Sequence, residues 1–497
     1  LKIRYIFVLS MFALFIFSLY SAKDLPKRFF PDSDRPQILV YTQLPAGTSS
    51  SDMDEHMRDI YKELNDKEQF AHIESYSAYV GFGGPRFVLS LAPEDPANNN
   101  GFIIVNIDDI ENQNVTMEQL DSVLKTKFPD MFFRVKRMFL GSSDASEFKI
   151  QVIGPDEDVI YEKSQEVLKV LRSIPGNTEL RTDWQNRIMK IAVNVDQQRA
   201  RRAEVTSDDI AASLSAYFSG SMITQYREKD NIIPIIFRAE GDERFNIDRL
   251  RTISIYSSKR GENVPLMQIA DFEGVNQYSQ IARLDMFRTV SIIGTNTNVT
   301  AQDFKDLFDP HMEELSKDLP TNHKLVWAGV VKDSKDAQTA LQANVPIAIG
   351  LIIVLLVGQF NSFRRPLIIM LTIPLSFIGA VWGLFISGSD LGFMVTLGLY
   401  SLAGIIINNG IVLIDRIDIE RNSGKETYDA IISACVARLR PISMSTITTI
   451  LGLLTLIIPH DPLFYGLSNA IAYGLAVGTI LTLAVVPSLY AIFFRAK

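Results

Sequence analysis

Apolar residues gather in six long runs along the chain, one near its start and five in its last third. They cover residues 3–20, 345–360, 367–386, 391–414, 442–459 and 467–494. A helix needs ~20 mostly apolar residues to cross a bilayer, because it rises about 1.5 Å per residue. The pattern therefore predicts a membrane α-helical bundle of six spans, arranged as one plus five.

The stretch between the first and second runs, residues 23–343, is polar, with alternating apolar positions and many turn residues. An order of strand, helix, strand, strand occurs at 37–91 and again at 148–195, and a partial copy follows at 289–328. Such repeats are typical of ferredoxin-like split βαβ units, in which helices cover one face of a small, mainly antiparallel sheet. We therefore expect a large α+β domain outside the bilayer.

Two strand pairs are predicted inside these repeats. The runs 71–80 and 86–91 flank the turn signal GFGGP, and the runs 179–183 and 188–195 follow the helix of the second repeat. Between the second and third copies, a predicted helix precedes SGSMITQYREKDNIIPIIFRA, whose pattern indicates a protruding hairpin. This hairpin belongs to an inserted subdomain.

These patterns divide the chain into parts with expected boundaries. The parts are a first membrane helix at 1–22, a first external subdomain at 23–145, a second at 146–190 and 283–332, the insertion at 191–282, and a five-helix bundle at 333–497. Within the bundle, the polar segment 415–441 is expected to be a cytoplasmic connector, with a short amphipathic surface helix at 426–437 as the alternative.

Positive charges orient the predicted bundle. Lys and Arg lie near both chain ends and after the second and fourth spans, whereas the loops 387–390 and 460–466 have none. By the positive-inside rule, both termini are cytoplasmic and the external domain lies on the other side of the membrane. The first run is too long for an ordinary signal peptide and lacks a small-residue cleavage site, so we expect a retained span. A chain that starts with Leu1 is expected to be a piece of a longer protein.

Composition excludes several functional classes. A formal net charge of −8 argues against a nucleic-acid partner. The single cysteine, Cys435, leaves the external domain without a disulfide. His56, His72, His323 and His460 are far apart, so no metal site is expected, and neither a nucleophile elbow nor a phosphate-binding loop is present. We therefore expect neither an enzyme nor a cofactor.

The fourth apolar run carries a polar seam. Ser401, Gly404, Asn408 and Asp415 fall close to one helix face, and Asn409 adjoins it. An amide that faces lipid would cost several kcal/mol, so the seam should meet other helices or a narrow wet path. Interhelical hydrogen bonds alone, worth roughly 0.6–2 kcal/mol each, are the simpler explanation.

Three stretches together carry a family resemblance. They read FFPDSDRPQILVYTQLPAGTS after the first span, GIIINNGIVLID in the seam, and ARLRPISMSTITTILGLLTL at the start of the fifth span. Over essentially its whole length, the chain resembles the second half of a resistance-nodulation-division (RND) transporter of the hydrophobe/amphiphile efflux branch.

The resemblance implies a multi-pass permease in the inner membrane of a Gram-negative bacterium. Such pumps are homotrimers that export amphipathic small molecules through a periplasmic adaptor and an outer-membrane channel, driven by inward proton flow. The insertion resembles their docking subdomain, whose hairpin reaches a neighbouring subunit. The acidic pair that carries the proton belongs to the N-terminal half, which is an expected partner of this chain.

The resemblance also assigns a proton-relay neighbourhood. Asn408 stands where the family usually has a lysine, and Ser445 aligns with a hydroxyl of the relay; Asn409 and Thr449 extend this polar site. An amide can hydrogen-bond a carboxylate but cannot offset its charge. Coupling through a modified hydrogen-bonded site is therefore one reading, and an uncoupled RND-like scaffold or partner subunit that does not transport is the other.

The substrate site is expected in the first external subdomain. There the family has an aromatic-lined pocket around the segment that here reads SYSAYVGFGGPRFVL. Tyr76, Tyr79, Phe82 and Phe87 are the candidates, because rings give a large contact area without demanding one substrate geometry. Plain core packing is the alternative for each ring. The glycine-rich loop at 81–85 is shorter than the family's loop, which questions a gating role.

Overall fold

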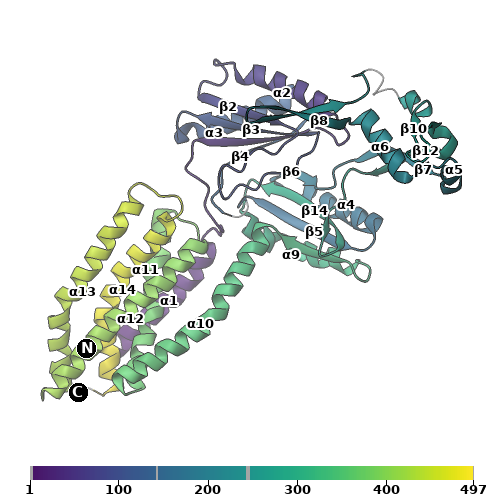
Figure 1. The fold of residues 1–497 in the computed structure, drawn as a ribbon. Helices are drawn as coiled ribbons and strands as arrows, with labels where there is room; N and C mark the ends of the chain where they lie inside the picture. The colour runs from purple at the N-terminus through teal and green to yellow at the C-terminus, as the bar shows by residue number, and fades with distance from the viewer. Residues whose placement is uncertain (1–3, 142–143, 242–246, 496–497) are drawn as a thin grey trace. The chain divides into compact units, whose positions relative to one another are not determined.

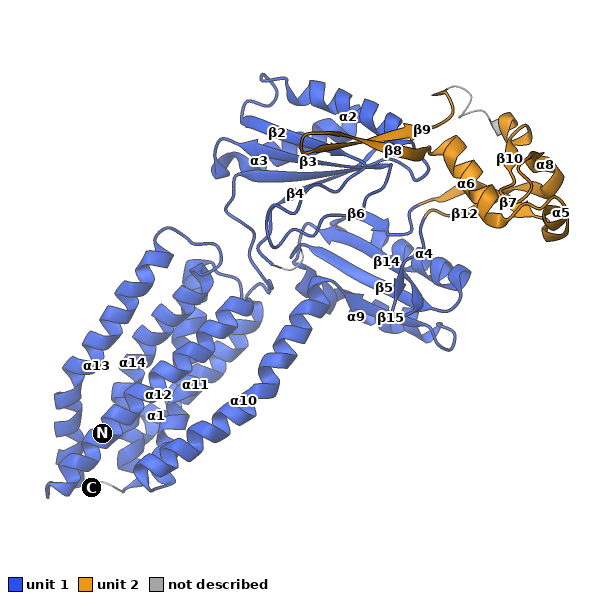
Figure 2. Ribbon diagram, in the orientation of Figure 1, with its two compact units in different colours: residues 1–185, 280–497 blue, residues 186–279 orange. Residues whose placement is uncertain are grey.

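The computed structural model describes residues 4–141, 144–241 and 247–495 (Figure 1). The chain divides into two compact units (Figure 2). The first comprises residues 1–185 and 280–497, and the second comprises residues 186–279. The first unit contains all the long apolar helices together with two separate β-sheets.

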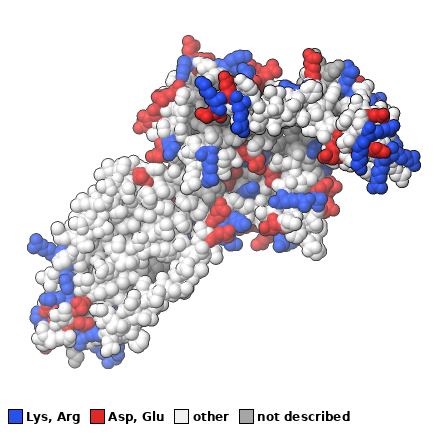
Figure 3. Space-filling view, in the orientation of Figure 1, with Lys and Arg blue, Asp and Glu red and all other residues white. Residues whose placement is uncertain are grey.

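Six helices of the described residues are long and apolar enough to cross a membrane. They are α1 (Arg4–Ser21), α10 (Val330–Phe360), α11 (Arg364–Ser387), α12 (Phe393–Asn422), α13 (Thr427–Ile457) and α14 (Tyr465–Phe493). Figure 3 shows an uncharged surface along these helices, with Lys, Arg, Asp and Glu gathered at the end that carries the termini and over the β-rich part. This distribution suits a bundle embedded in lipid.

Small residues bring α11 and α14 close together. A Cβ atom at Gly379 of α11 would lie 2.6 Å from the carbonyl oxygen of Tyr473 on α14, and one at Gly383 of α11 would lie 2.3 Å from the Cβ atom of Tyr473. Without side chains at these glycines, the helix backbones approach each other directly, as is common in membrane bundles. α11, α12 and α14 thereby form the core of the bundle.

The connector predicted over 415–441 is much shorter in the structure. α12 continues to Asn422 and α13 begins at Thr427, so residues 423–426 alone join them. The charged residues of this stretch do not end the helices, because they pair with one another: Glu420 lies 2.5 Å from Arg416 and 2.6 Å from Lys425. The polar stretch 415–441 therefore consists mainly of the end of α12 and the start of α13, which extend beyond the apolar runs.

The first subdomain is a four-stranded antiparallel sheet in the order β2-β3-β1-β4. Its strands are β1 (Gln37–Gln43), β2 (Ile73–Val80), β3 (Asn100–Ile107) and β4 (Phe132–Arg137). The helices α2 (Ser50–Leu64) and α3 (Gln113–Lys127) bury their apolar residues in one core with this sheet. Ser49 caps α2 by accepting a hydrogen bond from the backbone N–H of Asp52 at 3.2 Å.

The predicted pairing of 71–80 with 86–91 is wrong. β2 pairs with β3, with Tyr79 opposite Phe102, and residues 81–99 contain no strand. The glycines of GFGGP serve close packing here. A Cβ atom at Gly83 would lie 2.5 Å from the carbonyl oxygen of Glu94, and Gly84, at φ +80°, lies against the ring of Phe102.

The second subdomain is a five-stranded sheet in the order β13-β14-β5-β15, with β6 also paired to β14. Its elements are β5 (Glu147–Gly154), α4 (Glu157–Ser173), β6 (Asn177–Thr182), β13 (Arg283–Leu284), β14 (Phe287–Asn296), α9 (Ala301–Lys317) and β15 (Lys324–Ala328). The predicted pairing of 179–183 with 188–195 is also wrong, because β6 pairs with β14 while β7 (Arg187–Val195) pairs with β12 (Ala270–Tyr278) in the second unit.

The second unit has a small core and an exposed hairpin. Its core residues come from α5 (Gln197–Arg202), α6 (Ser207–Phe218), β10 (Ser254–Tyr256), β11 (Asn263–Pro265) and α8 (Leu266–Ile269), with the β7–β12 pair. β8 (Ser221–Glu228) and β9 (Asn231–Phe237) form the hairpin, and every residue of both strands is exposed. Several of these side chains are large and apolar, among them Met222, Ile223, Ile236 and Phe237.

Candidate functional site

The polar seam of α12 lies on an uncovered face of this chain. Ser401, Gly404 and Asn408 are all exposed, and a Cβ atom at Gly404 would meet nothing within 4 Å. Asn409 is 6% exposed and lies toward the bundle. Within the described residues, Asn408 has no hydrogen-bond partner. The seam is therefore open to a further membrane helix.

The hydroxyl face predicted on α13 is also uncovered. Ser445 and Thr448 are exposed, and Thr448 and Thr449 each donate a hydrogen bond to the carbonyl oxygen of Ser445 at 2.9 Å. Thr446 instead points inward, with its hydroxyl 2.8 Å from that of Thr479 on α14. No hydrogen bond joins Ser445 or Thr449 to Asn408 within the described part of the chain. Of the predicted relay residues, Asn408 and Ser445 are thus exposed on separate helices, Thr449 hydrogen-bonds within α13, and Asn409 is buried.

Arg438 is a polar residue of this region that the sequence interpretation missed. Its Nε atom is buried and has no hydrogen-bond partner among the described residues. Arg438 precedes Ser445 by two helical turns, so both lie on similar faces of α13. The two-turn spacing between Arg438 and Ser445 could have identified this residue. Arg438 was instead counted only among the positive charges that orient the bundle.

Two of the four predicted substrate rings come together. Tyr79 and Phe82 make an edge contact with ring centroids 6.1 Å apart, and Tyr79 also stacks near Phe102 at 6.4 Å. Phe82 keeps 41% of its surface exposed. This pair lies on the sheet face opposite α2 and α3.

The other two rings are placed elsewhere. Tyr76 lies on the opposite sheet face, since side chains alternate along a strand. Its hydroxyl donates to the carbonyl oxygen of Tyr61 at 3.0 Å, and its ring packs against that of Tyr61. Phe87 is exposed and shows no ring contact within the described residues. The contacts of Tyr76 are therefore with α2, through Tyr61.

A groove that sequence reasoning did not find lies beside the glycine-rich segment. Its volume is about 530 Å³. The lining residues are mostly apolar and come from 86–92 and 138–141, with Ser33 and Arg35 at its edge. None of the four predicted rings lines this groove. It could not be recognised before the path of residues 81–99 was known, because half of its wall comes from that segment.

The segment of residues 25–32, here called the strap, joins the membrane bundle to both subdomains. Pro26 accepts a hydrogen bond from the N–H of Leu391 at 2.8 Å, which places the strap at the start of α12. Lys27 lies 2.8 Å from Asp306 of α9, and its carbonyl oxygen accepts from the Thr300 hydroxyl at 2.7 Å. The strap thus contacts the seam helix and the second subdomain within a few residues.

Among the residues that the structure describes, no group of three or more His, Cys, Asp or Glu side chains could hold a metal ion. The polar groups described above lie on exposed faces of the membrane helices α12 and α13 and in the strap, between the bundle and the second subdomain.

Comparison with known proteins agrees with this arrangement. The model of the AcrB/AcrD/AcrF family matches residues 1–494. Two relatives are each 25% identical over 494 residues: the cation efflux system protein CzcA of Alcaligenes sp. (strain CT14) and the cobalt-zinc-cadmium resistance protein CzcA of Cupriavidus metallidurans. Each match covers 95% of this chain and 46% of the relative, so the chain spans about half the length of these curated relatives.

A solved structure shares the fold. The crystal structure of a heavy metal efflux pump superimposes with a TM-score of 0.72 and 19% identity, over 98% of this chain and 51% of that chain. The names of these relatives refer to metal cations, whereas the resemblance in the sequence pointed to the hydrophobe/amphiphile branch. The family itself is common to both, and the chain belongs to the AcrB/AcrD/AcrF family of RND efflux transporters.

Proposed function

We propose that this chain is the second half of an inner-membrane efflux permease driven by inward proton flow. The observation that carries the proposal is the uncovered seam, in which Asn408 and Gly404 face away from the chain's own helices. An amide at the middle of an apolar helix needs a polar partner. The N-terminal half would cover this face and supply the carboxylate that takes up the proton.

The same proposal accounts for the exposed hairpin of the second unit. Apolar side chains on both of its strands would be covered by a neighbouring subunit of a homotrimer. The trimer would lie in the inner membrane of a Gram-negative bacterium, with both termini of this chain cytoplasmic. A periplasmic adaptor and an outer-membrane channel would complete the export path.

Amphipathic small molecules are the substrate class that we propose first. The groove beside the glycine-rich segment is lined mostly by apolar side chains, with Arg86 at its wall, and the ring of Phe82 is exposed nearby in sequence. Such a lining suits a compound with an apolar body and a polar group. Divalent metal cations are the second candidate, because the relatives are named for their efflux.

An accumulation assay with the complete transporter, expressed with its adaptor in an efflux-deficient strain, tests these alternatives. An amphipathic dye and Zn²⁺ serve as probes. We expect several-fold lower dye accumulation than in cells without the pump. Lower Zn²⁺ with unchanged dye would favour the metal-cation candidate. If neither changes although the transporter and adaptor still assemble, the chain belongs to a non-transporting scaffold.

A further inference from the structure

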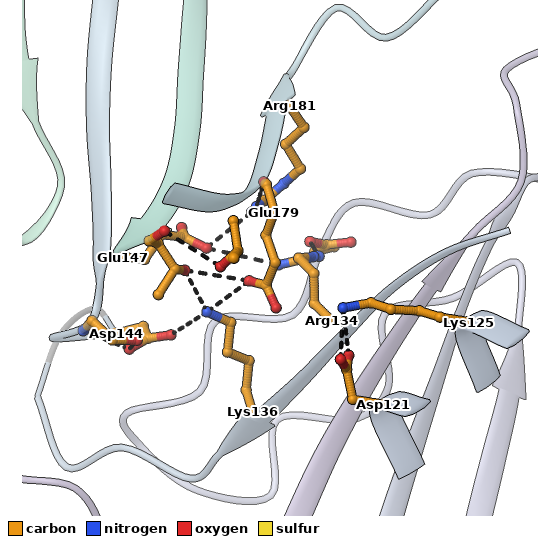
Figure 4. A network of polar contacts seen from close by, with 12 residues as sticks. Asp121, Lys125, Arg134, Lys136, Asp144, Glu147, Glu179 and Arg181 are labelled. Atoms are coloured by element: carbon orange, nitrogen blue, oxygen red, sulfur yellow. Dashed lines mark hydrogen bonds and ion pairs between the residues drawn. The ribbon is translucent and has the colours of Figure 1, made fainter. Parts of the chain in front are cut away.

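The two subdomains of the first unit have separate sheets, and polar side chains occupy the space where they meet. Figure 4 shows this polar network, which is centred on Lys136 of β4. The second subdomain contributes Glu147 of β5 and Glu179 and Arg181 of β6 to this network. Asp144 lies just before β5, on the segment that links the two sheets.

Lys136 makes the central contacts across this boundary. Its ammonium group lies 2.9 Å from a carboxylate oxygen of Glu179 and 3.4 Å from one of Asp144, and it donates a hydrogen bond to the Thr295 hydroxyl at 2.8 Å. Lys136 is 9% exposed, so these groups replace nearly all of its water. One lysine of the first sheet is thus held by two strands of the second.

Arg134, two residues before Lys136 on the same face of β4, makes similar contacts. Its guanidinium group pairs with Glu94 of its own subdomain and lies 3.9 Å from Glu147 of the second. Glu147 is also 3.0 Å from Arg181. The carboxylate of Glu147 therefore lies between one cation from each subdomain.

Buried ion pairs hold two surfaces in register without adding much net stability, because the charges lose their hydration. The same charges regain water when the surfaces separate, whereas an apolar contact would expose hydrophobic area. An open cavity of about 850 Å³, whose lining includes Arg137, Ser146 and Thr295, adjoins the network and gives water a route to it. This boundary can therefore open at a lower cost than the core of either sheet.

We propose that Lys136 is a positioning residue of a releasable latch that sets the closed spacing between the two subdomains. Loss of its charge leaves Glu179 and Asp144 buried without a cation, and separation of the subdomains rehydrates both carboxylates. The use of this opening in transport rests on the proposed function, but the closed spacing does not.

Spin labels on the complete transporter test the latch. Ser122→Cys on α3 and Ser173→Cys on α4 provide exposed label sites in a Cys435→Ser background. We expect Lys136→Met to increase the population of long label distances at least about threefold. Lys125→Met is the matched control, because Lys125 forms an exposed ion pair with Asp121 at 2.7 Å beside the network (Figure 4). This control should keep the wild-type distances.

A charge exchange completes the test. The exchange Lys136→Glu with Glu179→Lys, made together with Asp144→Asn so that the new carboxylate meets no like charge, should recover most of the closed population, and Lys136→Arg should keep it. Unchanged distances in Lys136→Met, or no recovery in the exchanged pair, would overturn the latch. Because this readout needs no substrate, opening without any loss of dye efflux would support the latch and count against its role in transport.

Discussion

Arg28 of the strap and Asp390 of the loop before α12 form an ion pair, with 3.2 Å between Nε of Arg28 and a carboxylate oxygen of Asp390. Arg28 also lies 2.9 Å from Asp32. The pair anchors the strap at the first turn of the seam helix, next to the backbone hydrogen bond from Phe393 to Phe29. A displacement of α12 would therefore move the strap with it.

Asp390→Asn should make the stability of the transporter less dependent on pH. Burial raises the pKa of Asp390, although the charge of Arg28 opposes this shift. A carboxyl group with a raised pKa stabilises the fold most below its unfolded value of about 3.9, and this contribution is lost as pH rises through the folded value. Thermal unfolding of the variant between pH 4 and 7 should thus vary less than that of the wild type.

Asp54→Asn is the control for this variant, because Asp54 pairs with Arg58 on an exposed helix face at 2.7 Å. At pH 7, Asp390→Asn should shift stability by less than about 1 kcal/mol, as expected for a half-exposed ion pair. An equal pH dependence in both variants would contradict the environment described for Asp390.

Asp144 should show the opposite pH dependence. Burial alone would raise the pKa of Asp144, but the nearby ammonium group of Lys136 holds it below the usual range. The stabilisation is present above the unfolded pKa of about 3.9 and is lost as pH falls through the folded value. Between pH 5 and 3, Asp144→Asn should therefore lose less stability than the wild type in thermal unfolding.

Gly83→Ala should destabilise the first subdomain by about 1–3 kcal/mol, because the new methyl group would collide with the backbone of Glu94. Gly274→Ala is the matched control, since a Cβ atom there meets nothing within 4 Å. Limited proteolysis of the complete transporter can compare the two. Equal resistance of both variants would show that residues 81–99 do not pack as described.

Phe82→Ala should raise the intracellular accumulation of bulky apolar compounds several-fold without lowering membrane abundance. The exposed ring of Phe82 is held by its edge contact with Tyr79 and offers contact area to a ligand. Tyr76→Phe, on the opposite sheet face, should leave accumulation unchanged. An equal loss of efflux for every substrate would instead indicate misfolding.

The helices of this chain follow from local pattern more closely than its strands do. The helix predicted within the second repeat, 148–195, corresponds to α4, because Asp156 caps its start and apolar residues recur along one face. Strand pairing was predicted wrongly at β2 and at β6. In both cases the partner strand lies beyond an intervening segment, and the turn signals nearby favoured the adjacent run instead.

The candidate sites show the same limit. Helical spacing predicted that Ser401, Gly404 and Asn408 share a face, but the uncovered state of that face depends on how α12 packs. Lys136 and Arg134 look like ordinary outward charges in the run FFRVKR. Their burial depends on the second sheet, whose carboxylates Glu147 and Glu179 lie on different strands, β5 and β6.

The pH dependence of efflux by the complete transporter, compared between wild type and Asn408→Lys, tests the proton-coupled seam most directly. A lysine that faces the carboxylate of the N-terminal half would stabilise its ionised form, so protonation would need a more acidic medium. We expect the midpoint of the efflux profile to move to lower pH at unchanged membrane abundance. An identical profile in the two proteins would contradict a titrating partner opposite Asn408.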